Sequence, residues 1–158
     1  MSDAVKMNLK GMDDFKKALK KAKNASLKVG ILGSSAVRGA GTSADTLTNA
    51  SIGASHEFGT SSLPRRSWLR EPLQDHLFKK MESSGLFGKS VADGIVKKKS
   101  LKDFLEKTGV VCIAVIAEGF ATGGYGKWKP SNMAYKKVAM TLVETGQLRD
   151  SVTYEVTE

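Results

Sequence analysis

The segment that most constrains the fold is the longest apolar stretch of the chain, Val110 to Ala117. The residues before it, Leu101, Phe104, Leu105 and Thr108, recur at spacings of three and four, as on one face of a helix. The β-branched residues within 110–117 are also compatible with a strand. We favour one long helix that continues from Leu101 through this stretch. It is shorter than the roughly 18 apolar residues that a membrane span needs, so it is expected to be a core element.

Two more helices are predicted between residues 46 and 81. Thr46 to Phe58 has apolar residues near helical spacing, and Gly59 is placed as a C-cap. Pro64 predicts a turn, and a second helix is expected from Trp68 to Met81, with Pro72 tolerated in its first turn. The apolar residues behind these predictions are Leu47, Ala50, Ala54 and Phe58 in the first helix and Leu69, Leu73, Leu77 and Met81 in the second.

Three short segments are candidate strands, and together they predict the fold class. Val5 to Leu9 and Ser151 to Val156 alternate apolar and polar residues, and Leu27 to Leu32 is the third candidate. An amphipathic helix is predicted from Met12 to Ala22. We therefore expect an α+β fold in which a small antiparallel or mixed sheet packs against three to four helices, with long flexible loops. The length fits one domain, residues 1–158.

Two glycine-rich segments are predicted to be loops. Gly33 to Asp45 has almost nothing to bury, so we expect it to be mobile in an isolated subunit. It lacks the Gly-Lys-Ser/Thr ending of a phosphate-binding loop, which argues against nucleotide binding. Ala121 to Gly126 is the second predicted loop.

Candidate catalytic groups are few. His56 and Glu57 are neighbours, but adjacent helical residues point about 100° apart, so the two side chains are not expected to converge. His76 lies on the next predicted helix, and the single Cys112 is expected to be a small buried hydrophobic residue. These residues do not make a zinc site or a general-base arrangement. We expect a protein that is not an enzyme, with no catalytic residues, no cofactor and no metal.

The charge and the arginines suggest a binding role. The net charge is +9, and residues 1–28 and 61–107 each contribute +5. Such a surface attracts nucleic acid or acidic proteins, although the lysines also fit the solvated faces of helices. Arginine and tryptophan dominate protein–protein hot spots. They can also bind phosphates and stack on bases, and a buried tryptophan between solvated arginines is a third interpretation. The candidate interaction residues are Arg65, Arg66, Trp68, Arg70 and Trp128, and we expect the arginines to serve assembly more than folding.

Taken in order, these motifs resemble those of the tailed-bacteriophage virion morphogenesis proteins, the family of tail-completion, neck and head–tail joining proteins. The resemblance spans nearly the whole chain and begins with a strand-Gly-helix pattern at residues 7–12. Its main motifs are Glu57-Phe58-Gly59-Thr60 with Pro64-Arg65-Arg66-Ser67-Trp68-Leu69-Arg70, then Trp128, Pro130-Ser131, Lys136-Lys137 and Thr145-Gly146-Gln147-Leu148-Arg149-Asp150-Ser151.

The resemblance implies a structural subunit of the phage neck or tail terminus, forming a ring that completes the tail or joins it to the head. The implied partners are other copies in a homo-oligomeric ring and other phage neck, portal or tail proteins, with non-specific DNA contact as an option. The protein would lie in the virion after assembly in the host cytoplasm, and no secretory signal or membrane contact is expected. The alternative is a non-sequence-specific nucleic-acid-binding protein, supported by the net charge and the Arg/Trp cluster.

Overall fold

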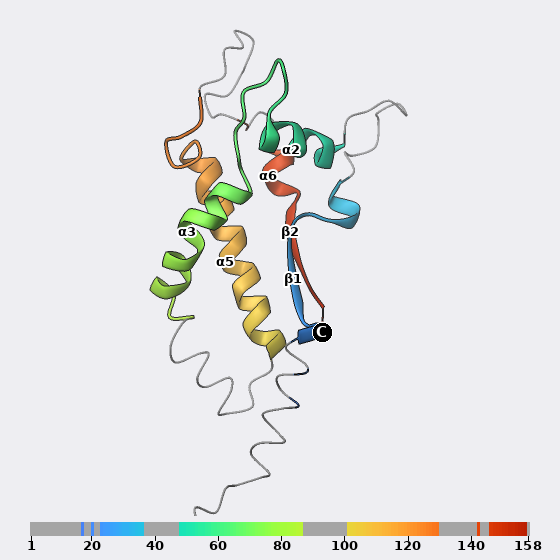
Figure 1. The fold of residues 1–158 in the computed structure, drawn as a ribbon, viewed down its shortest axis with the longest axis vertical. Coiled ribbons are helices and arrows are strands. Elements are labelled where there is room, and N and C mark those ends of the chain that lie inside the picture. The colour runs from blue at the N-terminus through green and yellow to red at the C-terminus, as the bar shows by residue number, and fades with distance from the viewer. Residues whose placement is uncertain are drawn as a thin grey trace, which may run out of the picture.

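Helix α5, Leu101–Ala121, is the centre of the computed structural model and packs between a two-stranded sheet and helix α3, Arg70–Ser83 (Figure 1). The structure describes residues 17, 20, 23–36, 48–86, 101–129, 142 and 146–157. The 21-residue length of α5 confirms the predicted continuous helix and shows that 110–117 is not a strand. Cys112 is 2% exposed, as expected for a small buried residue, and burial raises the pKa of its thiol.

The sheet joins two strands that are far apart in the sequence. Strand β1, Ser26–Ile31, pairs antiparallel with β2, Val152–Thr157, and Val29 lies opposite Tyr154. Because side chains alternate along a strand, the apolar members of both strands share the face that packs on α5. The strands predicted at 27–32 and 151–156 are confirmed, with an α+β class, whereas Val5 to Leu9 lies outside the described residues.

The contact between the sheet and α5 depends on a glycine. A Cβ atom at Gly109 would overlap the ring of Tyr154, so the ring lies directly against the backbone of α5. Gly109 is itself buried within the helix, where a glycine lowers helix propensity relative to alanine by about 1 kcal/mol. The close approach of β2 therefore explains why a glycine occupies the middle of the longest helix.

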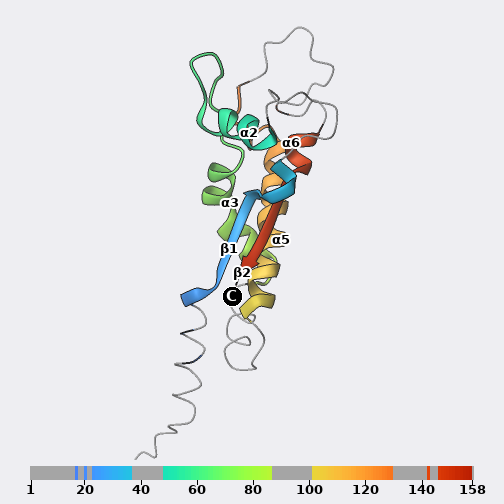
Figure 2. The same cartoon turned by 90° about the vertical axis from the view of Figure 1, so that its right-hand side faces the viewer.

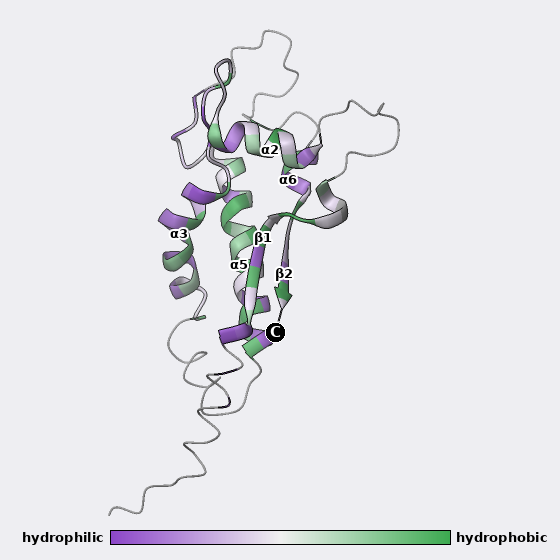
Figure 3. Ribbon diagram, turned by 45° about the vertical axis from the view of Figure 1, so that its right-hand side comes forward, coloured by the Kyte–Doolittle hydropathy of each residue, from purple (hydrophilic) through white to green (hydrophobic). Residues whose placement is uncertain are grey.

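Helix α3 covers another side of α5. The row Leu69, Leu73, Leu77 and Met81, predicted from its spacing, faces the core, and Met81 packs with Val111 and Val115 of α5. The outer turns of α3 are hydrophilic while much of α5 is hydrophobic (Figure 3). The helix ends at Ser83, close to the predicted end, and Gly85 follows with a φ of +71°.

The upper end of the sheet and of α5 is covered by α2, Asn49–Phe58, and α6, Gln147–Asp150 (Figures 1 and 2). The side chain of Thr48 caps α2 by accepting a hydrogen bond from the Ser51 amide at 3.1 Å. Helix α2 confirms the prediction for 46–58 apart from its start, and Gly59 is the C-cap. Helix α6 was not predicted, because four residues carry too little periodicity to recognise.

Two details of the sequence prediction are wrong. The buried residues of α2 are Asn49, Gly53 and Glu57, whereas Ala54 is exposed and Phe58 is 64% exposed, so the apolar row used to predict the helix is not its buried face. The segment 33–36 forms a short 3-10 helix, η1, rather than an open loop. The remainder of the loop predicted for 33–45 lies outside the described residues, as does most of the helix predicted for 12–22, of which Lys17 and Lys20 are described and exposed.

Replacing Gly109 by alanine should destabilise the fold, because the added methyl group collides with the Tyr154 ring. We expect a loss of about 2 kcal/mol in the free energy of unfolding, measured by urea denaturation. The same substitution in a Tyr154→Val background should cost clearly less, since the smaller side chain leaves room. Equal costs in the two backgrounds would contradict the proposed contact.

Candidate interaction site

The loop between α2 and α3 projects beyond the end of the helical layer (Figures 1 and 2). It begins at Gly59, whose φ of +78° ends α2. Its tip closes on itself, since the Thr60 amide donates to the Leu63 carbonyl and the Leu63 amide donates to Thr60 Oγ1, both at 3.0 Å. Pro64 and Arg65 follow and are exposed.

The loop is held at its base by one buried carboxylate. Glu57 Oε1 accepts hydrogen bonds from Ser67 Oγ at 2.7 Å, Arg70 Nε at 2.9 Å and the Arg70 amide at 3.3 Å. Oε2 accepts from the amides of Trp68 and Leu69, each at 2.9 Å. Both oxygens are thus occupied, and the last turn of α2 is tied to the first turn of α3.

The same contacts satisfy the first turn of α3. Its N-cap residue, Leu69, makes no side-chain capping bond, and the Glu57 carboxylate takes over that role from another helix. Ser67 Oγ, while donating to that carboxylate, accepts from the Glu71 amide at 3.1 Å. Pro72 has no amide hydrogen, and the Leu73 amide bonds the Leu69 carbonyl. The amides that a helix start normally leaves unpaired all have partners here.

The charge state of Glu57 follows from these contacts. Burial alone would raise the pKa of its carboxyl group, but hydrogen bonds from Ser67, Leu69 and Arg70 outweigh burial and lower the pKa below the ordinary value of 4.5. The residue lies in the last turn of α2, where a negative charge is unfavourable to the helix dipole. Its carboxylate, however, lies against the first turn of the neighbouring helix α3, where a negative charge is favourable to the helix dipole. The position is therefore explained by the second helix rather than by its own.

Trp68 is a core residue. It is 4% exposed, its Nε1 donates to the Gly53 carbonyl at 2.8 Å, and its ring lies 6.0 Å from that of Phe120. A Cβ on Gly53 would come within 3.0 Å of both Trp68 and Ile31, so the ring needs a glycine on α2. The hypothesis that Trp68 is a surface contact is corrected: the ring fills the space between α2 and α5.

Arg66 and Trp128 also serve the fold more than the surface. Arg66 is 6% exposed, its Nε donates to the Lys129 carbonyl at 3.0 Å and its amide donates to the His56 carbonyl at 2.8 Å. Trp128 is half-buried, and its Nε1 donates to the Ser67 carbonyl at 3.1 Å. These bonds tie the residues after α5 to the base of the loop. Arg66 was expected from the sequence to be a partly exposed charge, and its 6% exposure contradicts that expectation.

Three side chains near the loop do face solvent. The side chains of Arg65 and Arg70 are 52% and 51% exposed, and Phe58 is 64% exposed. Arg65 pairs with Glu71 at 2.6 Å, and the guanidinium carbon of Arg70 lies 4.7 Å from the centre of the Phe58 ring. Of the five predicted interaction residues, Arg65 and Arg70 keep accessible side chains, although Arg70 also supports Glu57. Phe58 was not predicted to belong to this surface.

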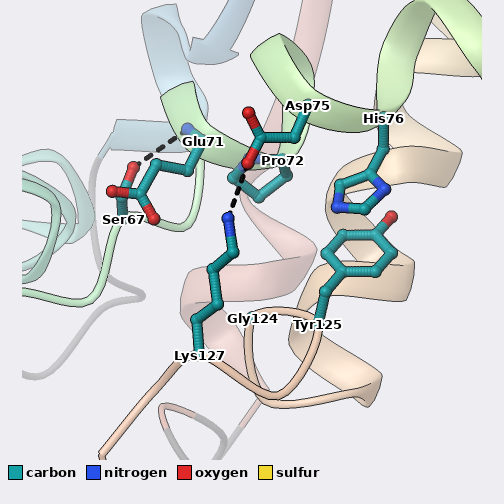
Figure 4. A pocket seen from close by; sticks show the side chains of 8 residues that line it. All are labelled: Ser67, Glu71, Pro72, Asp75, His76, Gly124, Tyr125 and Lys127. Carbon is teal, nitrogen blue, oxygen red and sulfur yellow. Dashed lines mark hydrogen bonds and ion pairs between the residues drawn. The ribbon is translucent and has the colours of Figure 1, made fainter.

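A shallow hollow lies between α3 and the turn after α5 (Figure 4). Lys127 pairs with Asp75 at 2.6 Å, which lowers the pKa of the Asp75 carboxyl group through that hydrogen bond. The rings of His76 and Tyr125 stack at 3.6 Å, and Tyr125 Oη donates to the Val115 carbonyl at 2.9 Å. The Lys127–Asp75 ion pair and the Tyr125–His76 ring stack both connect the turn to α3, so they stabilise the packing of the turn on this helix.

Within the described parts of the chain, no three His, Cys, Asp or Glu side chains come together as a metal site would require. In those same parts, every helix is too short or too polar to cross a bilayer.

No family model, curated protein or solved structure matches this chain with significant similarity.

Replacing Glu57 by glutamine should destabilise the protein. The new side-chain NH2 group is a hydrogen-bond donor, and it would face the amide, hydroxyl and guanidinium donors that now bind the carboxylate oxygens. We expect the free energy of unfolding to fall by about 3 kcal/mol. Glu71→Gln is the matched control: it removes an ion-paired surface carboxylate and should cost less than about 0.5 kcal/mol. Similar losses for both variants in urea denaturation would contradict the central role of Glu57.

The stabilisation from Glu57 should depend on pH in a defined direction. Because its pKa is lower in the folded than in the unfolded state, its contribution is present above about pH 4.5 and is lost as the pH falls through the folded value. The difference in stability between the wild type and Glu57→Gln should therefore be large at about pH 7 and smaller at about pH 3. A difference that stays constant across this range would show that the carboxylate charge is not involved.

Proposed function

We propose that this chain is a structural subunit of the phage neck or tail terminus, where it forms a ring that completes the tail or joins it to the head. The observation that carries the proposal is the loop between α2 and α3, which is held in place at its base by the hydrogen bonds of Glu57. The motif through which the chain resembles the virion morphogenesis family, residues 57–70, is the segment that this bracing holds together. Its shape is set by Glu57, Trp68 and Arg66, which are buried, while Phe58 and Arg65 face outward.

A fixed loop of this kind suits a permanent contact surface. An interface loses less conformational entropy on binding when its side chains and loops are already ordered. The loop has both ends attached to helices through the Glu57 hydrogen bonds, and its tip is closed by the Thr60–Leu63 pair. Arg65 is the exposed arginine of the loop, and the exposed Phe58 and Arg70 flank the loop on α2 and α3. Aromatic residues and arginine are enriched in protein interfaces.

The alternative, a non-sequence-specific nucleic-acid-binding protein, is weaker on the same observations. Trp68 is buried and cannot stack on a base, and Arg66 is buried with its Nε bonded to the Lys129 carbonyl. Several exposed lysines pair with carboxylates: Lys80 with Glu118, Lys107 with Asp103 and Lys127 with Asp75. Such pairs reduce the positive potential that would attract phosphates. We therefore place DNA contact second to protein assembly.

Electron microscopy of purified virus particles tests the proposed location. An antibody fragment against this chain should label the junction between head and tail in particles that contain it. Labelling of the capsid shell or the distal tail would contradict the proposal, and so would the absence of the chain from mature particles.

The alternative function, nucleic-acid binding, is tested by titrating the protein with two unrelated DNA duplexes at two salt concentrations. We expect at most weak binding to both, lost at about physiological salt, because only counterion release would drive it. An affinity difference of about a hundredfold between the duplexes would indicate base recognition and would contradict the structural role.

A further inference from the structure

The described residues carry three large apolar side chains that are mostly exposed: Phe58 at 64%, Phe78 at 65% and Val110 at 57%. Two of them lie beside a charged residue, one beside a positive charge and the other beside a negative charge. Phe58 lies under the guanidinium group of Arg70, and Val110 follows Glu106 by four residues on the exposed side of α5. Residues four apart on a helix are neighbours, so Glu106 and Val110 form one surface patch.

In the first patch, Phe58 with Arg70, the guanidinium group is oriented so that it can bind a carboxylate. Arg70 donates from Nε to Glu57 at 2.9 Å and lies over the Phe58 ring, while its side chain stays 51% exposed. Within the described parts of the chain, no hydrogen bond uses its terminal amino groups. An arginine whose orientation is fixed and whose outer donors face solvent can bind a carboxylate side by side through two hydrogen bonds.

The second patch, Glu106 with Val110, has the complementary chemistry. Glu106 is exposed, and among the described residues it makes no ion pair, whereas the nearby Asp103 pairs with Lys107 at 3.0 Å. An unpaired carboxylate beside an exposed aliphatic side chain matches an arginine beside an exposed aromatic ring. A phosphate backbone would match the arginine alone, so the apolar half of each patch favours a protein partner.

We infer that the Phe58–Arg70 patch of one copy binds the Glu106–Val110 patch of the next. This inference rests on the proposed ring and names the contact that would build it. The two patches differ: Phe58 and Arg70 lie on α2 and α3, whereas Glu106 and Val110 lie in the first half of α5. A contact between different patches is head-to-tail, and it closes into a ring or extends into a helix according to the rotation between copies.

Sedimentation velocity over a concentration series tests the contact. The wild-type chain should form assemblies larger than a dimer. Phe58→Ser and Glu106→Lys should each weaken assembly by about tenfold or more, while their melting temperatures stay near that of the wild type. Phe78→Ser is the matched control, because it removes the same side chain at the same exposure from another surface. It should assemble like the wild type.

Mixing the two disrupted variants gives a sharper result. Phe58→Ser keeps an intact Glu106–Val110 patch, and Glu106→Lys keeps an intact Phe58–Arg70 patch, so an equimolar mixture should form dimers and nothing larger. The pairing is overturned if the mixture stays monomeric or if either variant alone assembles normally. It is also overturned if Phe78→Ser is equally disruptive or if the wild type stays monomeric. None of these outcomes changes the location of the chain in virus particles, which tests the proposed function separately.

Discussion

The arrangement of this protein depends on one buried carboxylate. Glu57 belongs to α2 by sequence, yet its hydrogen bonds go to the start of α3 and to the residues just before it. A carboxylate with burial of this degree is costly unless each oxygen is well bonded. Here backbone amides, a hydroxyl and an arginine supply those bonds. The cost of burying the charge is offset only when α2, the loop and α3 are all in place, so the three segments form one unit.

The second constraint is the close approach of elements to α5. Gly109 lets β2 lie against the helix backbone, and Phe120 near its end packs between the two tryptophan rings. Trp68 is hydrogen-bonded to α2, and Trp128 is hydrogen-bonded to the base of the loop. The loop therefore stands on a rigid support, and the exposed Phe58 and Arg70 keep a fixed relation to the core. Fixed geometry of this kind differs from that of a hinge or lid, which has to move.

The sequence predicted the elements better than the site. Long periodic patterns identified α5 and α3, and alternation identified β2, because burial of one face imposes a period that a single sequence displays. The buried face of α2 was missed because it consists of Asn49, Gly53 and Glu57, which are not apolar. Trp68 and Arg66 were assigned to the surface from residue type alone, which does not report depth. One signal was available: an acidic residue in the last turn of a helix opposes the dipole, so Glu57 required a compensating partner elsewhere.

The most direct test of this account is the exchange of single backbone amides, followed by nuclear magnetic resonance at neutral pH. The amides of Trp68 and Leu69 lie outside regular secondary structure, and in the structure their hydrogen-bond acceptor is the Glu57 carboxylate. If that carboxylate holds the loop, both amides should exchange as slowly as those in the middle of α3, and the Glu57→Gln variant should lose this protection while the middle of α5 keeps it. Rapid exchange of both amides in the wild-type protein would contradict the account, because the base of the loop would then be open.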